Sequence, residues 1–153
     1  MTDQGALGEM AKTIIDSNRY MALGTADSEG LPWVSPVWFA TTNYRDFFWV
    51  SKPQAKHSRN LASRGQASIV IFDSQVTPGL AQAVYMSALA GELSAGELEV
   101  GLSVFGDRSE AQGLPRWALS AVQAPALHRL YRATALEHFV LSERDERLPV
   151  TLA

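Results

Sequence analysis

A basic stretch with no acidic residue lies just before the middle of the chain. Between residues 47 and 72 there is no Asp or Glu, although the protein carries 16 acidic residues in total. Five basic side chains fall in this window: Lys52, Lys56, His57, Arg59 and Arg64. Two of the protein's three lysines are among them, so positive charge is concentrated in one short segment.

The sequence around these cations predicts a strand, then a turn, then the start of a helix near Lys56. The first N–H groups of a helix have no hydrogen-bond partners within it, and the helix dipole adds a positive potential there. Cationic side chains and free backbone donors in one place suit a phosphate group. The stretch therefore predicts a binding site for a phosphorylated small molecule, without specifying a reaction.

Aromatic residues precede and enter this stretch. Trp33, Trp38 and Trp49 fall within 17 residues and account for three of the protein's four tryptophans. Any one of them can be explained by packing in a core or a subunit interface. Three so close together also form a wall against which a flat ligand can lie.

Composition narrows the classes of function. A chain of 153 residues suits one domain over residues 1–153, and 46% hydrophobic with 19% charged residues is typical of a globular protein. The net charge of −3 and the pI near 5.6 argue against nucleic-acid and anionic-membrane binding, which need a basic face. No apolar run could span a bilayer, so we expect a cytoplasmic protein that binds neither nucleic acid nor membrane.

Other residues that often carry chemistry offer no recognisable site. The chain has no cysteine, which excludes disulfides, thiolate nucleophiles and thiolate metal sites. His128 and His138 have no third ligand near them in the sequence, so no metal is expected. Ser58 and Ser103 lack the spacing of a nucleophile elbow or a triad. No catalytic side chain is assigned.

The segments that must position the basic stretch are β-rich runs separated by tight turns. Strands are predicted at residues 20–26, 31–41, 47–51, 67–72 and 82–93, with a last strand or pair of strands at 127–141. Pro36 interrupts the second run, and it cannot donate a ladder hydrogen bond. It therefore marks an edge strand, a bulge or the wall of a site.

Helices are predicted around these strands. The first covers residues 5–17, with Thr2 or Asp3 as its cap, and the second covers residues 56–64 and ends at Gly65. A capping box at residues 94–97 begins a third, and a further helix is predicted around Trp117, Leu119 and Val122. Short strands, tight turns and few inserted helices favour a mainly β protein built as an antiparallel barrel.

Two segments carry a resemblance to a known family. Residues 20–73 (YMALGTADSEGLPWVSPVWFATTNYRDFFWVSKPQAKHSRNLASRGQASIVIFD) resemble the core of the pyridoxamine 5′-phosphate oxidase-like family of flavin-binding split barrels. Residues 128–141 (HRLYRATALEHFVL) resemble its closing strand. The resemblance implies a six-stranded antiparallel split β-barrel with a few short helices, and a homodimer with FMN at the subunit interface.

The resemblance also implies which residues hold the cofactor. The strand at 34–39 runs along the flavin ring, Ser51 lies beside the ring, and the basic turn holds the phosphate. Gln82 matches a glutamine that reaches the flavin. The implied cofactor-binding residues are Val34, Ser35, Pro36, Val37, Trp38, Ser51, Lys52, Lys56, His57 and Gln82.

The chain also departs from the enzyme that gives the family its name. Ser35 stands where that oxidase has an arginine for the flavin phosphate, and His57 stands where it has a lysine. Ala83 and Val84 occupy a region where an arginine is usual. These differences argue against pyridoxamine phosphate as the substrate.

We therefore expect an FMN-dependent oxidoreductase that acts on an unknown small molecule. The alternative is a non-catalytic protein of the same fold that carries a flavin, a deazaflavin or haem. His57 and His128 are the candidate axial ligands for haem.

Overall fold

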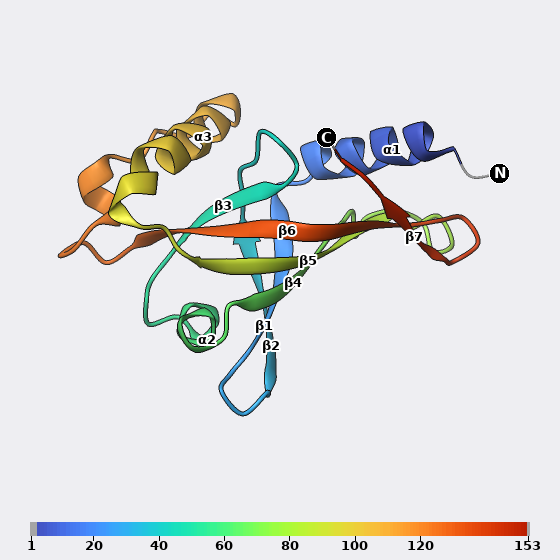
Figure 1. Cartoon of the computed structure of the whole chain (residues 1–153). Helices are drawn as coiled ribbons and strands as arrows, with labels where there is room; N and C mark the ends of the chain where they lie inside the picture. Colours follow the sequence, from blue (N-terminus) through green and yellow to red (C-terminus); the bar gives the residue numbers. More distant parts are fainter. Residues whose placement is uncertain (1–2, 153) are drawn as a thin grey trace.

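The structure, a computed structural model, describes residues 3–152. One antiparallel sheet forms its centre, with helices packed around it (Figure 1). The strands are β1 (Tyr20–Ala26), β2 (Pro32–Trp38), β3 (Asp46–Ser51), β4 (Gln66–Phe72), β5 (Ala83–Glu92), β6 (Arg129–Leu141) and β7 (Arg147–Val150). The α-helices are α1 (Gln4–Ser17), α2 (Lys56–Ser63) and α3 (Leu98–Ala111), and the 3₁₀ turns are η1 (Ala95–Glu97) and η2 (Leu119–Val122).

The sheet curls into a barrel that does not close completely. Six strands follow the order β2-β1-β4-β5-β6-β3, and β7 pairs with the second half of β6. Between the end strands β2 and β3, the pairing found in residues 3–152 is a single bridge from Ala40 to Phe48. This arrangement confirms the predicted mainly β split barrel with peripheral helices, and β7 is an additional strand.

The barrel encloses the main hydrophobic core. Alternate residues of each strand point inward, so that Leu23, Phe39, Phe47, Trp49 and Ile71 are almost fully buried there. Helix α1 covers one end of this core with its apolar face. Asp3 caps that helix by accepting hydrogen bonds from the N–H groups of Gly5 and Ala6, as predicted for one of its two candidate caps. The other, Thr2, lies outside the described residues.

A second, smaller core lies on the outside of the barrel beneath α3, at the opposite end of the sheet from α1 (Figure 1). We call it the satellite core. Its buried members are Ala40, Phe48, Leu93, Leu98, Phe105, Val122 and Leu130. The predicted capping box is present at Ser94 and Glu97. Helix α3 approaches the sheet closely at Gly101, where a Cβ would lie 2.6 Å from Leu93 Cδ1.

Pro36 occupies the edge of the sheet. It lies on β2, which pairs through its length with β1 alone and places Pro36 opposite Ala22. The edge-strand interpretation of this proline is therefore confirmed. No second strand pairs with β2 at this position, so the missing N–H of Pro36 costs no hydrogen bond between strands.

Two predicted features differ from the structure, and one strand was not predicted. Helix α2 ends at Ser63, and the N–H of Arg64 bonds back to Asn60, so Gly65 does not provide the left-handed cap that was predicted. The helix predicted around Trp117 is only the single turn η2, because prolines and glycines flank it. The segment at 127–141 forms one long strand, which is one of the two predicted alternatives, and β7 follows it as a strand that was not predicted.

Candidate functional site

His57 lies in the first turn of α2 and is held between two hydroxyl groups from two different strands. Its Nε2 is 2.8 Å from Ser51 Oγ at the end of β3, and its Nδ1 is 3.2 Å from Ser35 Oγ on β2. Either tautomer of the ring can make both bonds, since each serine hydroxyl can donate or accept. Three residues that are 6 and 22 positions apart in sequence are thus brought together, as predicted for a common site.

Trp33 and Lys56 extend this group toward solvent. The indole N–H of Trp33 donates to Ser35 Oγ over 3.1 Å, and Lys56 Nζ lies 5.6 Å from the centre of the Trp33 ring. The latter distance is that of a cation–π contact. Trp33 remains 46% exposed, so its ring offers an accessible apolar surface. We call Trp33, Ser35, Ser51, Lys56 and His57 the α2 cluster.

Burial sets the charge of His57. The half-buried position of the ring lowers its pKa below the usual value for histidine, because the charged form loses hydration. The free protein therefore holds a neutral imidazole at neutral pH. A phosphate dianion beside the ring would act in the opposite direction and favour the protonated form.

The start of α2 has free backbone donors. The first bond of the helix runs from the Arg59 N–H to the Ala55 carbonyl, so the amides of Lys56, His57 and Ser58 have no partner within the helix. Ala55 occupies the N-cap position and supplies no side-chain cap, and the first turn contains no acidic residue. These amides and the Lys56 ammonium form a donor set suited to a phosphate.

A buried hydrogen bond fixes α2 to the barrel. Asn60 Nδ2 donates to Thr25 Oγ1 of β1 over 3.1 Å, and both side chains are buried. A buried polar pair of this kind is expensive to break, since either partner alone would be left without a hydrogen bond. The pair therefore holds the α2 cluster in place, and nothing in the sequence spacing of Asn60 and Thr25 indicated it.

One acidic group lies closer to the cluster than the sequence suggests. Asp27, in the β1–β2 turn, has a lowered pKa, chiefly because the Leu31 N–H donates to its carboxylate and in smaller part because of the charge on Lys56. Its oxygen accepts from Glu29 and Leu31 over 2.9 and 3.0 Å. Although residues 47–72 contain no acidic residue, Asp27 from outside this segment lies close enough to interact with Lys56.

The five predicted residues of β2 divide between its two faces. Ser35 and Val37 point toward the interior, where Val37 is a core residue, whereas Val34, Pro36 and Trp38 belong to the outer face. Val34 is 65% exposed. The Trp38 ring packs edge-on against Phe105 in the satellite core, away from the α2 cluster.

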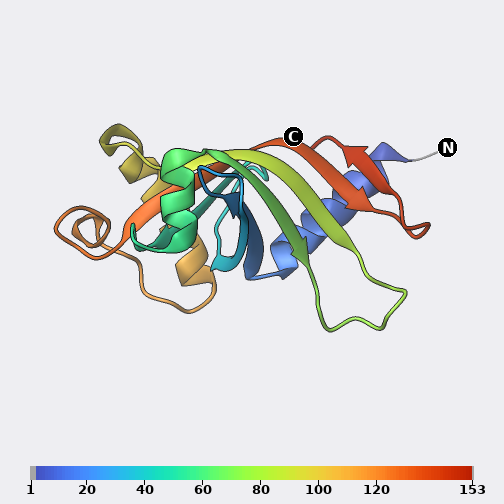
Figure 2. The same ribbon diagram turned by 90° about the horizontal axis from the view of Figure 1, so that it is seen from below.

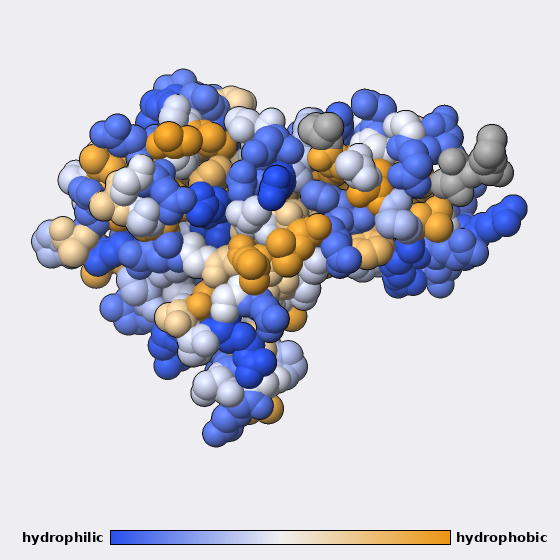
Figure 3. Space-filling view, viewed as in Figure 1, coloured by the Kyte–Doolittle hydropathy of each residue, from blue (hydrophilic) through white to orange (hydrophobic). Residues whose placement is uncertain are grey.

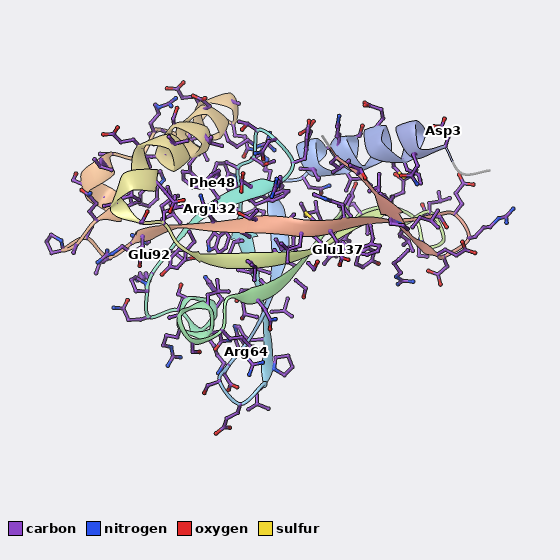
Figure 4. The ribbon with its side chains drawn as sticks, in the orientation of Figure 1. Asp3, Phe48, Arg64, Glu92, Arg132 and Glu137 are labelled. Atoms are coloured by element: carbon purple, nitrogen blue, oxygen red, sulfur yellow. The ribbon has the colours of Figure 1, made fainter. Side chains whose placement is uncertain are left out.

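The remaining predicted residues lie apart from the cluster. Lys52 is exposed, and its carbonyl accepts from the Ala55 N–H in the turn before α2. Gln82 precedes β5 in the β4–β5 loop, which Figure 2 shows at the far end of these strands from α2. Arg64 lies on the β1–β2 side of α2, with its guanidinium 3.4 Å from the Ser28 carbonyl oxygen (Figure 4).

Comparison with known families identifies the chain. A family model described as pyridoxamine 5′-phosphate oxidase matches residues 7–125, well over half of the sequence. The chain belongs to the pyridoxamine 5′-phosphate oxidase family. The matched region contains β1 to β5, all of α2 and α3, and every residue of the α2 cluster. Comparison with curated protein sequences found no significant match.

Solved structures share the family's fold. The haem storage protein HutZ from Vibrio cholerae is 24% identical, with a TM-score of 0.69 over 88% of this chain and 94% of that one. A haem-binding protein from Mycobacterium smegmatis is 20% identical, with a TM-score of 0.74 over 99% of this chain and 59% of that one. An FAD-binding protein from Mesorhizobium loti is 18% identical, with a TM-score of 0.59 over 84% and 87%. At these identities the likeness establishes the fold.

The residues present suit a phosphorylated, flat cofactor of the kind that family membership implies. Free amides and Lys56 supply donors for a phosphate, and the exposed ring of Trp33 supplies an apolar surface. Among residues 3–152 no cluster of three potential metal ligands is found. No helix in the same range is long and apolar enough to cross a bilayer.

Proposed function

We propose that this protein binds FMN and acts as an oxidoreductase on a small molecule. The observation that carries the proposal is the start of α2, where uncapped amides and Lys56 lie beside the exposed ring of Trp33. Lys56 and the α2 amides would donate hydrogen bonds to the phosphate, and His57 would contribute the charge of its protonated ring. The backbone of β2 near Val34, Ser35 and Pro36 would run along the flavin ring. FMN, when bound, would supply the hydride and electron chemistry, and the protein would supply binding and orientation.

His57 would adjust its charge to the ligand. In the free protein it is a neutral, half-buried ring between two hydroxyls. When a phosphate binds at the start of α2, the imidazole would take up a proton and both ring nitrogens would become donors. Ser35 and Ser51 would then hold the orientation of the ring by accepting from it. This behaviour differs from that of a permanently charged lysine at the same position.

A second copy of the chain would complete the site. On the face seen in Figure 3, apolar side chains gather over β5 and β6, where Leu89 and Leu136 are 52% and 59% exposed. Exposed apolar patches of this kind mark interaction surfaces. In such a dimer Gln82, which is far from the α2 cluster of its own chain, would be free to reach the partner's flavin. The protein would therefore be a homodimer with two cofactor sites.

Haem binding is the second candidate, since HutZ and the Mycobacterium smegmatis protein are described as haem proteins and share the fold. The geometry of His57 argues against it as an axial ligand, because both of its ring nitrogens already have hydrogen-bond partners. His128, the other candidate, lines a cavity of about 310 Å³, which is too small for a macrocycle such as haem. Flavin binding is therefore the better-supported function.

The test is the visible spectrum of the purified protein, followed by titration with FMN, riboflavin and haemin. The proposal predicts a two-banded flavin spectrum that bleaches with dithionite, and much tighter binding of FMN than of riboflavin. A sharp Soret band with haemin and no uptake of FMN would replace this function with haem binding. Sedimentation velocity of the FMN-loaded protein tests the dimer, which a monomer that binds FMN tightly would contradict.

A further inference from the structure

A cavity of about 310 Å³ lies in the satellite core, separate from the α2 cluster. It is bounded by the outer face of β2 and β3, by the second half of α3 and by the segment that follows that helix. Its lining includes Trp38 and Val50 from the strands, and Leu114 and Pro115 from the segment after α3. We call it the α3 cavity. Its volume is at the lower limit for small-molecule sites, so it suits one or two fused rings rather than a macrocycle such as haem.

Aromatic rings at steep angles to one another form the walls. Trp38 and Phe105 meet edge-on with centroids 4.9 Å apart, and Phe105 meets Trp117 in the same way at 6.5 Å. Trp117 in turn meets the His128 ring at 5.3 Å and 75°. These ring–ring contacts hold the four side chains in fixed orientations. A flat ligand can therefore stack on one ring while its edge meets the face of another.

Two polar groups of the cavity lining, on Ser109 and Trp38, already have partners. Ser109 Oγ donates to the Phe105 carbonyl over 2.9 Å, and the Trp38 indole N–H donates to Gln112 Oε1 over 2.7 Å. These bonds also hold the side chains in place before any ligand enters. Neither group therefore has a free hydrogen-bond donor to offer a ligand.

The nearby cations are also occupied. Arg116 pairs with Asp107 and Glu110, each at 3.0 Å. Arg108 donates to the backbone carbonyls of Asp16 and Asn18, and Arg129 donates to those of Ala126 and His128. A phosphate or carboxylate entering the cavity would find no free guanidinium or ammonium among these groups. The arrangement disfavours an anionic ligand.

Two polar groups at the cavity remain available. Within residues 3–152, neither the Trp117 indole N–H nor the imidazole of His128 has a hydrogen-bond partner. Both side chains are partly exposed and belong to the cavity wall. They can hydrogen-bond a hydroxyl or carbonyl on the edge of a ring that lies between the apolar walls.

We propose that the α3 cavity binds an uncharged, planar aromatic molecule of one or two fused rings with a hydroxyl or carbonyl group on one edge. The ring system would lie against Trp38 and Phe105, and the polar edge would meet Trp117 and His128. The inference rests on the cavity itself and does not depend on FMN. It adds a second ligand site on the opposite face of β2 from the α2 cluster.

The test is a titration of ¹⁵N-labelled protein with 1-naphthol, observed through the indole N–H signals of the four tryptophans. The signals of Trp38 and Trp117 should shift, while those of Trp33 and Trp49 should stay in place. 1-Naphthyl phosphate, which carries the same rings with a negative charge, should bind at least tenfold more weakly. No shift up to the solubility limit of 1-naphthol, a shift confined to Trp33, or equal binding of the phosphate would overturn the proposal.

Variants locate the site independently. Trp117→Ala should weaken 1-naphthol binding roughly three- to tenfold, with the Trp38 signal as reporter. His128→Phe keeps an aromatic ring but removes the hydrogen-bonding nitrogens, so it should weaken 1-naphthol more than naphthalene. Val100→Ala is the matched control, because Val100 lies on α3, is 70% exposed and does not line the cavity. Unchanged affinity in both folded cavity variants would contradict the assignment.

Discussion

Two aromatic regions lie on opposite faces of β2, and they differ in the charges around their rings. In the α2 cluster, Trp33 lies beside Lys56 and the uncapped start of a helix. In the α3 cavity, Trp38 packs among other rings, and the nearby arginines are already paired. Because successive residues of a strand face opposite sides, one strand can present two surfaces of different chemistry. Under the two proposals, the similar tryptophans of β2 would serve an anionic ligand on one side and a neutral one on the other.

The largest expected effect comes from removing the charges of the α2 cluster. The double variant Lys56→Ala/His57→Ala should weaken FMN binding about tenfold to a hundredfold or more. It removes the charged hydrogen bond from Lys56 to the phosphate, worth ~1.5–3 kcal/mol, together with the nearby charge of the protonated His57 ring. Riboflavin, which has no phosphate, should lose much less affinity. Fluorescence titration of both ligands measures the difference. Lys12→Ala, which removes one positive charge from α1, should leave both affinities unchanged.

Equal losses for FMN and riboflavin would show that the double variant damages the site as a whole. The proposed difference between the two regions would then be wrong, because the charges of the α2 cluster would not favour an anionic ligand over a neutral one.

A second variant should disturb the satellite core without changing the α2 cluster. Gly101→Ala places a methyl group 2.6 Å from Leu93 Cδ1 and 3.1 Å from both Leu130 and Phe48, so either the Leu93 side chain or α3 must shift. We expect a loss of about 1–3 kcal/mol in the free energy of unfolding. Urea unfolding measures it. Gly96→Ala is the control, because nothing lies within 4 Å of its added Cβ.

Under conditions in which the Gly101→Ala variant is fully folded, its affinity for FMN should be nearly the same as that of the natural protein. A large loss of FMN binding there would mean that the two regions are coupled through β2.

The buried bond that anchors α2 should have a smaller effect. Asn60→Ala leaves Thr25 Oγ1 without its donor, and we expect the free energy of unfolding to fall by about 1–2 kcal/mol. Ser63→Ala on the same helix is the control, since Ser63 is exposed and bonds only to backbone carbonyls of α2. Comparable losses for the two variants would indicate a general effect on helix α2 rather than the anchor.

The smallest effect is a pH dependence of stability. The pKa of His57 is lowered in the folded protein, so the unfolded chain binds more protons once the pH falls below the ordinary value of about 6.5. Stability should therefore decrease as the pH falls from that value through the lowered folded pKa. Thermal unfolding between pH 7.5 and pH 5.5 should show a shallower decrease for His57→Asn than for the natural protein. His138, whose pKa burial also lowers, accounts for the decrease that remains.

Local sequence patterns predicted most of the strands, but they predicted few of the side-chain contacts that form the candidate site. The strand at residues 20–26 and the edge position of Pro36 follow from β propensity and from the missing proline N–H. By contrast, β7 is short and contains a proline, so its pairing with β6 depends on tertiary contact rather than on local pattern. The sequence therefore predicted the strands of the barrel but not the additional strand β7 at its edge.

The candidate site shows the same division. The cationic turn, His57 and Ser51 were predictable from charge and from family resemblance. The bond between Ser35 and His57 depends on where β2 and α2 meet, 22 residues apart, and the proximity of Asp27 to Lys56 depends on the curl of the β1–β2 turn. Trp38 could be assigned to a face of β2 only after its partners on α3 were known. Such contacts arise from packing between distant segments.

The pairing of β3 with β6 has a consequence for how the chain folds. It joins residues 46–51 to residues 129–134, about eighty positions later, whereas β1 and β2 are neighbours in sequence. Contacts with large sequence separation require costly loop closure and form slowly. On a ribosome, the β1–β2 hairpin and the β4–β5 pair can form while the chain is still growing. The β3 strand can join the sheet only after β6 has emerged. We therefore expect the large aromatic side chains of β3 to remain without their strand partner until β6 has been synthesised.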